Sequence, residues 1–226
     1  MQRYNSFNLI HKGLPAMLYD TASSIQRAYF GDTNEAAIAL DKVEEALFLF
    51  ENHAHHEDSF VLPAIEAHEP QVVEQFEQEH EEDLRLASRL KKLVNIYRNI
   101  FLSEERINCG SAIAKSFVEF MVFNLEHMAK EEIIINHALW KYYTDEQILA
   151  LNQKLIASIP PAEFALATKW MIRGVSNFEA VNWLISVKQT APSFVFDGLL
   201  SIAEKELPAH RYHEIRDQIT VQVIAA

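Results

Sequence analysis

The chain has 226 residues, 49% of them hydrophobic, which is enough to bury one large core. Asp and Glu (32) outnumber Lys and Arg (20), and the net charge of −12 argues against nucleic acid and anionic membranes as partners. The single cysteine, Cys109, excludes an internal disulfide, a thiolate-rich zinc site and a self-contained iron–sulfur cluster. The sequence shows neither the apolar run of a signal peptide nor a membrane span, so we predict a soluble, cytoplasmic protein.

Long amphipathic helices are the first structural prediction. The chain contains only 5 Gly and 7 Pro, and apolar residues recur at steps of three and four with almost no strand pattern. We expect four long helices over about residues 6–30, 33–68, 71–102 and 112–143. Thr33 is the expected N-cap of the second helix, and residues 103–111 are expected to form a break between the third and fourth.

Shorter helices are expected in the last third of the chain, over about residues 145–158, 161–173, 177–190, 193–206 and 209–222. The predicted fold class is therefore all-α, with an up-down-up-down four-helix bundle over residues 1–143 and a short-helix C-terminal extension over residues 144–226. The extension has no catalytic motif, and we expect it to pack a small core, to cover the bundle or to form a homodimer surface. The residues expected in that core are Trp170, Met171, Phe178, Trp183, Leu184, Phe194, Phe196 and Leu200.

Two His/Glu pairs stand out because they interrupt apolar helix faces. His53/Glu57 and His127/Glu131 have the four-residue spacing that places both side chains on one face. His210/Glu214 has the same spacing, but its face is half polar, which is typical of a solvated helix. The faces of the first two pairs otherwise contain residues typical of a core, so we expect these pairs to point inward.

Single histidines occupy the apolar faces of the other two long helices, at His11 and His80. In an up-down-up-down bundle, residues at equal distances from a connecting turn lie at one level. Counted from the expected turns, the histidines of successive helices differ by at most about five residues, or about 8 Å along the helix axis. We therefore expect four histidines and two glutamates in one layer of the core.

Such a layer needs a cation, because burying unpaired carboxylates and imidazoles would cost many kcal/mol. Nitrogen and carboxylate ligands without thiolate suit iron, manganese or zinc. Two carboxylates can bridge two metal ions, while the histidines supply terminal ligands and an oxide or hydroxide completes the bridge. The pattern therefore predicts a centre with two metal ions, and the same residues taken singly would be ordinary structural histidines.

The combined pattern resembles the hemerythrin-like, or HHE cation-binding, domain family over about residues 6–142. The resemblance is carried by the six residues of the layer, the literal His56-Glu57 and the following Phe60-Val61-Leu62-Pro63. It implies a four-helix bundle with a non-haem di-iron centre. By this resemblance Glu57 and Glu131 bridge the irons, and the terminal ligands are His11, His53, His80 and His127.

One feature departs from that family. Dioxygen-carrying members have a fifth histidine, commonly next to the one on the third helix, and no histidine is found there in this chain. Either one iron keeps an open or water-filled position, or a nearby side chain fills it. Glu77 and His56 are the candidate extra ligands or neighbours of the site, since each lies three residues from a predicted ligand. An open position favours reactivity over simple reversible carriage.

The sequence is compatible with several functions. The resemblance implies a di-iron protein that binds, senses or stores iron or binds dioxygen, nitric oxide or peroxide. The alternative is an oxidoreductase acting on one of these ligands, or an iron donor in iron–sulfur cluster repair. A third interpretation is an interaction module in which the metal only stabilises the bundle. The sequence has no nucleophile–base pair or nucleotide-binding motif, so any catalysis belongs to the metal.

Overall fold

The computed structural model describes the backbone of residues 3–225 and the side chains of residues 3–221. Every regular element within residues 3–225 is helical and none is a strand, which confirms the predicted all-α fold class. Contacts divide the chain into two compact units. Unit 1 comprises Met1–Phe7 and Met17–Ser158, and unit 2 comprises Asn8–Ala16 and Ile159–Ala226. Helix α1 (Ile10–Arg27) is continuous and contributes residues to both units.

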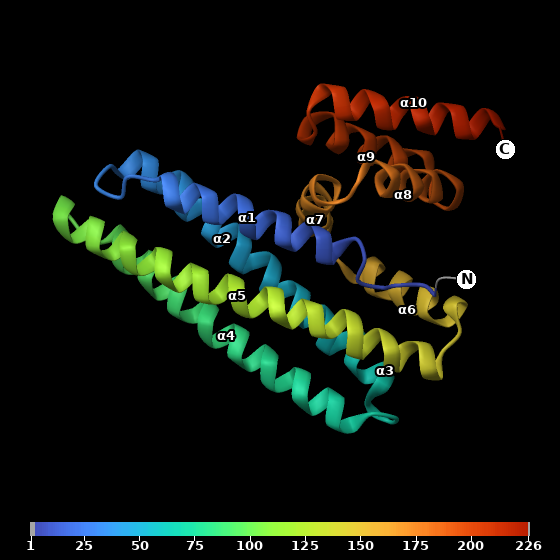
Figure 1. The fold of residues 1–226 in the computed structure, drawn as a ribbon, viewed down its shortest axis with the longest axis horizontal. Helices are drawn as coiled ribbons and strands as arrows, with labels where there is room; N and C mark the ends of the chain where they lie inside the picture. Colours follow the sequence, from blue (N-terminus) through green and yellow to red (C-terminus); the bar gives the residue numbers. More distant parts are fainter. Residues whose placement is uncertain (1–2, 226) are drawn as a thin grey trace. The chain divides into compact units, whose positions relative to one another are not determined.

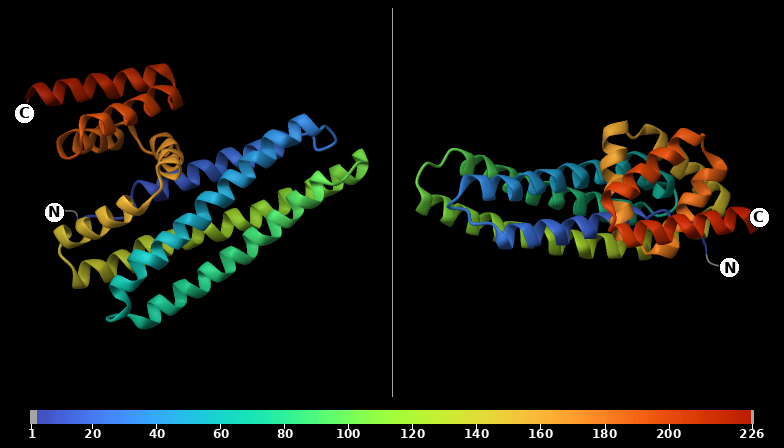
Figure 2. Two further views of the ribbon diagram at one scale, coloured as in Figure 1. Left: turned by 180° about the vertical axis from the view of Figure 1, so that it is seen from behind. Right: turned by 90° about the horizontal axis from the view of Figure 1, so that it is seen from above.

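Unit 1 is built around long helices of alternating direction (Figure 1). The first is the part of α1 that belongs to unit 1. The others are α2 (Thr33–His56), α4 (Pro70–Arg98) and α5 (Ser103–Tyr142). The α1–α2 and α4–α5 turns lie at the same end of this unit (Figure 2), where the Tyr97 hydroxyl donates to the Phe30 carbonyl at 2.7 Å. This arrangement confirms the predicted up-down-up-down four-helix bundle with additional shorter helices.

The start of α5 differs from the prediction. Residues 103–111 were expected to form a break, but α5 begins at Ser103 and runs for 40 residues. Cys109 and Gly110 are buried, and the Phe30 side chain occupies the space that a Cβ at position 110 would take. The segment is polar enough to resemble a loop, but packing of its buried face against Phe30 favours the helix.

The N-cap of the second predicted helix lies one residue earlier than expected. Asp32, rather than Thr33, is the N-cap of α2, and its carboxylate accepts hydrogen bonds from the backbone of Asn34 at 2.7 Å and Glu35 at 3.2 Å. An aspartate at this position satisfies free N–H groups and interacts favourably with the helix dipole.

The same helix was predicted to continue to residue 68, but a π-helical turn interrupts it. The α-helical part ends at His56, a π-helical turn η1 spans Glu57–Val61, and a short α3 spans Leu62–Glu66. The N–H of Leu62 donates to the carbonyl of Glu57, five residues earlier. Pro63 has no N–H to donate to the turn before it, which weakens regular α-helical bonding at this point. Turns of this kind are often found at functional sites.

Helix α6 (Asp145–Ser158) and the N-terminal residues complete unit 1. Arg3 donates to Asp145 at 2.6 Å, and Trp140 donates to the Tyr4 carbonyl at 2.7 Å. Ile148 of α6 is buried in an apolar cluster with residues from η1, α3, α4 and α5. These contacts explain why α6 groups with the bundle rather than with the helices that follow it.

Unit 2 contains the last four helices, and α8–α10 pack against one another (Figure 2). Their bounds are α7 (Pro161–Gly174), α8 (Asn177–Thr190), α9 (Ser193–Glu206) and α10 (Ala209–Ala225). The core includes Leu184 and the buried face of α10. Two predicted core residues are exposed instead, since Phe178 is 70% and Phe194 is 73% exposed. Both lie in the first turn of a helix, where helical periodicity alone does not fix the buried face.

Residues 8–16 pack on α7 by direct backbone contact. A Cβ at Gly13 would lie 2.7 Å from the Met171 nitrogen, and a Cβ at Gly174 would overlap the Lys12 carbonyl. Lys12 also pairs with Glu179, next to the capping box that Glu179 forms with Ser176. The two glycines therefore permit an approach that no other residue allows without moving a helix.

The predicted boundary between two domains after residue 143 stays a prediction. The contact-based units place residues 145–158 with the bundle and residues 8–16 with the C-terminal helices. Among the described residues, no helix has both the length and the apolar character that crossing a membrane requires.

Candidate metal centre

The first half of the centre comes from the end of α2 and the π-helical turn. His53 lies in the last turn of α2, and Glu57 opens η1. His53 Nε2 is 3.3 Å from Glu57 Oε1, and their side chains are 12% and 3% exposed. The four-residue spacing places both groups on the inner face, as predicted.

His80 brings α4 to the same point. Its Nε2 lies 3.4 Å from Glu57 Oε2 and 3.8 Å from Glu131 Oε1. Its other ring nitrogen, Nδ1, forms a 2.6 Å hydrogen bond with Asp58 Oδ1. The imidazole is therefore surrounded by three carboxylates from two other segments of the chain.

Helix α5 contributes His127 and Glu131. His127 Nε2 lies 2.9 Å from Glu131 Oε1, and His127 Nδ1 lies 2.8 Å from Glu79 Oε2. The His80 and His127 rings meet edge to face with centroids 5.0 Å apart, and Phe123 stacks on His127. These apolar and aromatic neighbours hold the imidazoles in fixed orientations and exclude water from their faces.

The ligand atoms converge. Glu57, His80, His127 and Glu131 each offer an atom, and these atoms lie within 4.8 Å of one another. His53 also has a ligand atom within 4.8 Å of atoms of Glu57 and Glu131. Both glutamates therefore belong to two groups of candidate ligands, which is the arrangement that shared, bridging carboxylates require.

Burial and neighbouring charges shift the pKa values of the acids and imidazoles at the centre. Burial, together with the charge of Glu131, raises the pKa of Glu57 well above its ordinary value. Burial lowers the pKa of His80, but the carboxylates of Asp58, Glu131 and Glu57 outweigh it and raise this pKa to about 12. Glu131 and Glu79 likewise overcome burial and raise the pKa of His127. The ionisable groups of the centre therefore shift one another's pKa values strongly.

The donor set fits a metal ion. His80 Nε2 is buried without a hydrogen bond, although it faces two carboxylates. A cation between these groups would accept the imidazole lone pair and both carboxylates at once, and it would displace the imidazole protons. Imidazole and carboxylate ligands without thiolate suit iron, manganese and zinc.

Comparison with protein-family models identifies the domain. Residues 10–138, more than half of the chain, match the model described as the hemerythrin HHE cation-binding domain. The chain belongs to the hemerythrin HHE family. The match confirms the resemblance that the histidines and glutamates predicted, and the clustered side chains of this HHE domain are compatible with cation binding. Neither the curated proteins nor the solved structures gave a significant match.

Three further residues were predicted at or near the centre of this HHE domain. His11 is 6% exposed on the first turns of α1, in the segment that groups with unit 2, and its role as a ligand stays a prediction. His56 is half-buried and contacts the His55 ring, whereas Glu77 is exposed. Neither His56 nor Glu77 belongs to the ligand groups found among the described residues.

Sequence reasoning missed the acids outside the ligand set. Asp58 and Glu79 each hold the Nδ1 atom of a histidine, and Asp83 is buried with a 2.6 Å hydrogen bond from Asn124. Burial raises the pKa of Asp83. The adjacency of Asp58 to Glu57 and of Glu79 to His80 was visible in the sequence. Adjacency alone does not distinguish an inward-reaching carboxylate from a solvated one.

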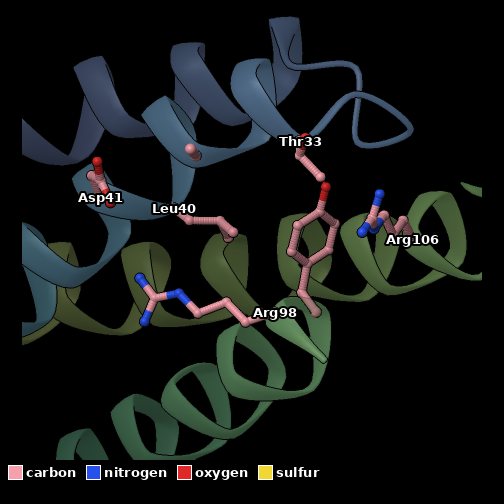
Figure 3. A pocket seen from close by; sticks show the side chains of 7 residues that line it. Thr33, Leu40, Asp41, Arg98 and Arg106 are labelled. Atoms are coloured by element: carbon pink, nitrogen blue, oxygen red, sulfur yellow. The ribbon is translucent and has the colours of Figure 1, made fainter. Parts of the chain in front are cut away.

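A surface pocket occurs elsewhere in the HHE domain, between α2, α4 and α5 (Figure 3). It is lined by Thr33, Ala37, Leu40, Asp41, Tyr97, Arg98 and Arg106. Asp41 precedes Glu57 by about 24 Å of helix, so the pocket is separate from the metal centre. Both arginines already have partners, since Arg98 pairs with Glu44 at 2.7 Å and Arg106 donates to the Ile100 carbonyl at 2.9 Å.

Proposed function

We propose that this protein is a non-haem di-iron binding protein that binds or senses a small diatomic ligand or peroxide. The observation that carries this proposal is the sharing of Glu57 and Glu131 between two groups of histidines. Each glutamate would bridge two iron ions, one ion held by His80 and His127 and the other by His53 and His11. Manganese and zinc fit the same ligands, and iron is proposed because the family resemblance favours it.

Iron ions, when bound, would supply binding and electron transfer toward dioxygen, nitric oxide or peroxide. The protein's own residues would do the rest. The two carboxylates would balance the positive charge of the ions, and the imidazoles would bind through Nε2. Phe76, Phe123 and the neighbouring apolar residues keep bulk water from the imidazole faces.

An enzymatic role is the second candidate, and the ligand count favours it. The fifth histidine of dioxygen-carrying relatives is absent, and the acid expected near its place, Glu77, is exposed. A coordination position left to an exogenous ligand suits an oxidoreductase acting on nitric oxide, peroxide or dioxygen. An iron donor for cluster repair would instead release its iron to an acceptor, so catalytic turnover of these ligands distinguishes the two roles.

The test is metal analysis of protein loaded anaerobically with ferrous iron, combined with its absorption spectrum after oxidation. We expect two equivalents of iron in the wild type, and about one or less in His53→Ala and His127→Ala. His210→Ala is the matched control, because His210 has the same spacing to a glutamate but is exposed. Two equivalents retained in both inner variants would show that the ligands are wrongly assigned.

The homodimer remains part of the proposal. Phe178 and Phe194 are large apolar side chains exposed on unit 2, and burial in a symmetric contact would remove them from water. Light scattering coupled to gel filtration measures the mass directly. A monomeric mass at high protein concentration would eliminate the dimer without affecting the metal proposal.

A further inference from the structure

Two imidazoles of the centre each lie between an inner and an outer carboxylate. His80 has Glu57 3.4 Å from Nε2 and Asp58 2.6 Å from Nδ1. His127 has Glu131 2.9 Å from Nε2 and Glu79 2.8 Å from Nδ1. The inner acids are proposed ligands, whereas the outer acids contact the far side of each ring.

We propose that Asp58 and Glu79 are positioning residues that hold His80 and His127 with Nε2 directed at the metal. This inference rests on the proposed function, since it assigns a role to acids that do not touch the metal themselves. It extends the site from the ligands to the groups that orient them and tune their basicity.

The physical argument concerns the two nitrogens of each ring. A neutral imidazole protonated on Nδ1 presents a lone pair on Nε2, and a carboxylate that accepts the Nδ1 proton selects this tautomer. The same hydrogen bond fixes the rotation of the ring about its χ2 angle. It also increases electron donation from Nε2 to the metal, which stabilises the more oxidised state of a redox-active ion.

The π-helical turn places Asp58 for this role. Glu57 and Asp58 are consecutive, and side chains of consecutive residues in a regular α-helix diverge by about 100°. Here both reach the same imidazole, one at each ring nitrogen, from the turn in which the Leu62 N–H donates to the Glu57 carbonyl. The widened turn thus presents a ligand and a positioning acid from adjacent positions.

Glu79 is held differently from Asp58. Its carboxylate also accepts hydrogen bonds from Lys130 and Gln75, each at 3.0 Å, and its side chain is 15% exposed. Lys130 neutralises part of the charge that Glu79 would otherwise direct at His127. Asp58 is more exposed, at 45%, but it makes the shorter contact to its histidine and has no lysine partner among the described residues, so the loss of its charge should influence the metal more strongly than the loss of the Glu79 charge.

The test uses the full-length protein and two probes. Zn²⁺ affinity, measured by competition with a coloured chelator after removal of bound metal, does not depend on redox chemistry. We expect Asp58→Ala and Glu79→Ala to weaken Zn²⁺ binding about 10- to 100-fold. Glu81→Gln removes an exposed acid from α4, the helix that carries Glu79, and should bind Zn²⁺ as the wild type does.

Charge and orientation are separated by a second pair of variants. Asp58→Asn keeps an oxygen that accepts the Nδ1 proton but loses the charge, and Asp58→Glu keeps the charge. In iron-loaded protein, Asp58→Asn should raise the reduction potential, by more than Glu79→Gln does, while Asp58→Glu restores it toward the wild-type value. If Asp58 and Glu79 had a purely structural role, these variants would change stability, but their reduction potentials would not follow this order.

Outcomes for the two proposals differ. Unchanged Zn²⁺ affinity in Asp58→Ala and Glu79→Ala, with an unchanged potential in Asp58→Asn, would overturn the positioning role while leaving a two-metal wild type intact. A wild type that binds no metal, or that retains two ions after loss of His53 or His127, would instead defeat the proposed function. Circular dichroism of each variant confirms that the measured protein is folded.

Discussion

At the residue scale, the buried acid Asp83 of unit 1 is tolerated because it has a specific partner. Asp83 is 3% exposed, and the Asn124 amide donates to its carboxylate at 2.6 Å and to the Phe120 carbonyl at 3.0 Å. Both residues lie about one turn from the histidines of the centre, at His80 and His127. Loss of the amide would leave a buried carboxylate without its donor, which costs more than the hydrogen bond itself contributes.

Asn124→Ala should therefore lower the free energy of unfolding by about 1–3 kcal/mol, as measured by urea denaturation. The double variant Asp83→Leu/Asn124→Leu should lose less than the single variant Asn124→Leu, because it removes the buried polar group together with its partner. Equal losses in the double and single Leu variants would mean that the pair does not determine stability here.

Glu179 gives a prediction about pH. The hydrogen bond with Lys12, followed by those with Ser176, lowers the pKa of Glu179 to about 2. A pKa lowered by folding contributes stability that is present above the unfolded value of about 4.5 and is lost as pH falls toward 2. The pair is partly exposed, so its contribution is about 1 kcal/mol.

Thermal unfolding measured between pH 6 and pH 2 tests this pair. Glu179→Gln should lower the melting temperature at pH 6, and its difference from the wild type should shrink as the pH approaches 2. A difference that stays constant across this range would show that the carboxylate charge is not involved.

At the element scale, two glycines decide how closely residues 8–16 approach α7. The contact at Gly174 is with backbone atoms of Lys12 and Gly13, so an added Cβ can be accommodated only by displacing one helix from the other. Gly198, in α9, has no atom within 4 Å of the position of its Cβ and serves as a matched site.

Gly174→Ala should destabilise the protein by about 1–3 kcal/mol, because overpacking exceeds the gain in helix propensity. Gly198→Ala should be neutral or stabilise it by up to about 1 kcal/mol. The difference between the two midpoints in urea isolates the close packing from the general effect of replacing glycine. Similar midpoints would contradict the proposed role of the contact.

At the scale of the whole molecule, the metal centre joins three segments that are distant in sequence. η1, α4 and α5 each supply at least one buried group to it. A metal ion that binds the folded state alone adds its binding free energy to folding stability.

Removal of metal by a chelator should therefore lower the unfolding free energy by about 3 kcal/mol relative to protein with free metal at 100 times Kd. Hydrogen exchange should locate the change, with faster exchange in α2, α4 and α5 and little change in α8–α10. Identical melting curves with and without metal would argue against a structural contribution of the ion. Uniformly faster exchange in all helices would show that the two units do not respond separately.

Much of the helical architecture followed from the sequence alone, because the three- and four-residue recurrence of apolar residues is a local property. The same periodicity placed His53, Glu57, His127 and Glu131 on inward faces, since residues four apart share a face whatever the helix packs against. His80 lies on a third apolar face. Residue counts from the expected turns predicted that it lies at the same level of the bundle as the two His/Glu pairs. The family followed from this combination rather than from any single residue.

Tertiary structure decided the features that depend on which surfaces meet. Burial against Phe30 extended α5 back to Ser103, and the π-helical turn at Glu57–Val61 turned Asp58 toward a histidine on another helix. Residues 8–16 joined the C-terminal helices through a glycine contact that nothing in the local sequence required. Helical periodicity specifies the inner face of each segment. The partners found on that face depend on distances between segments that are remote in the chain.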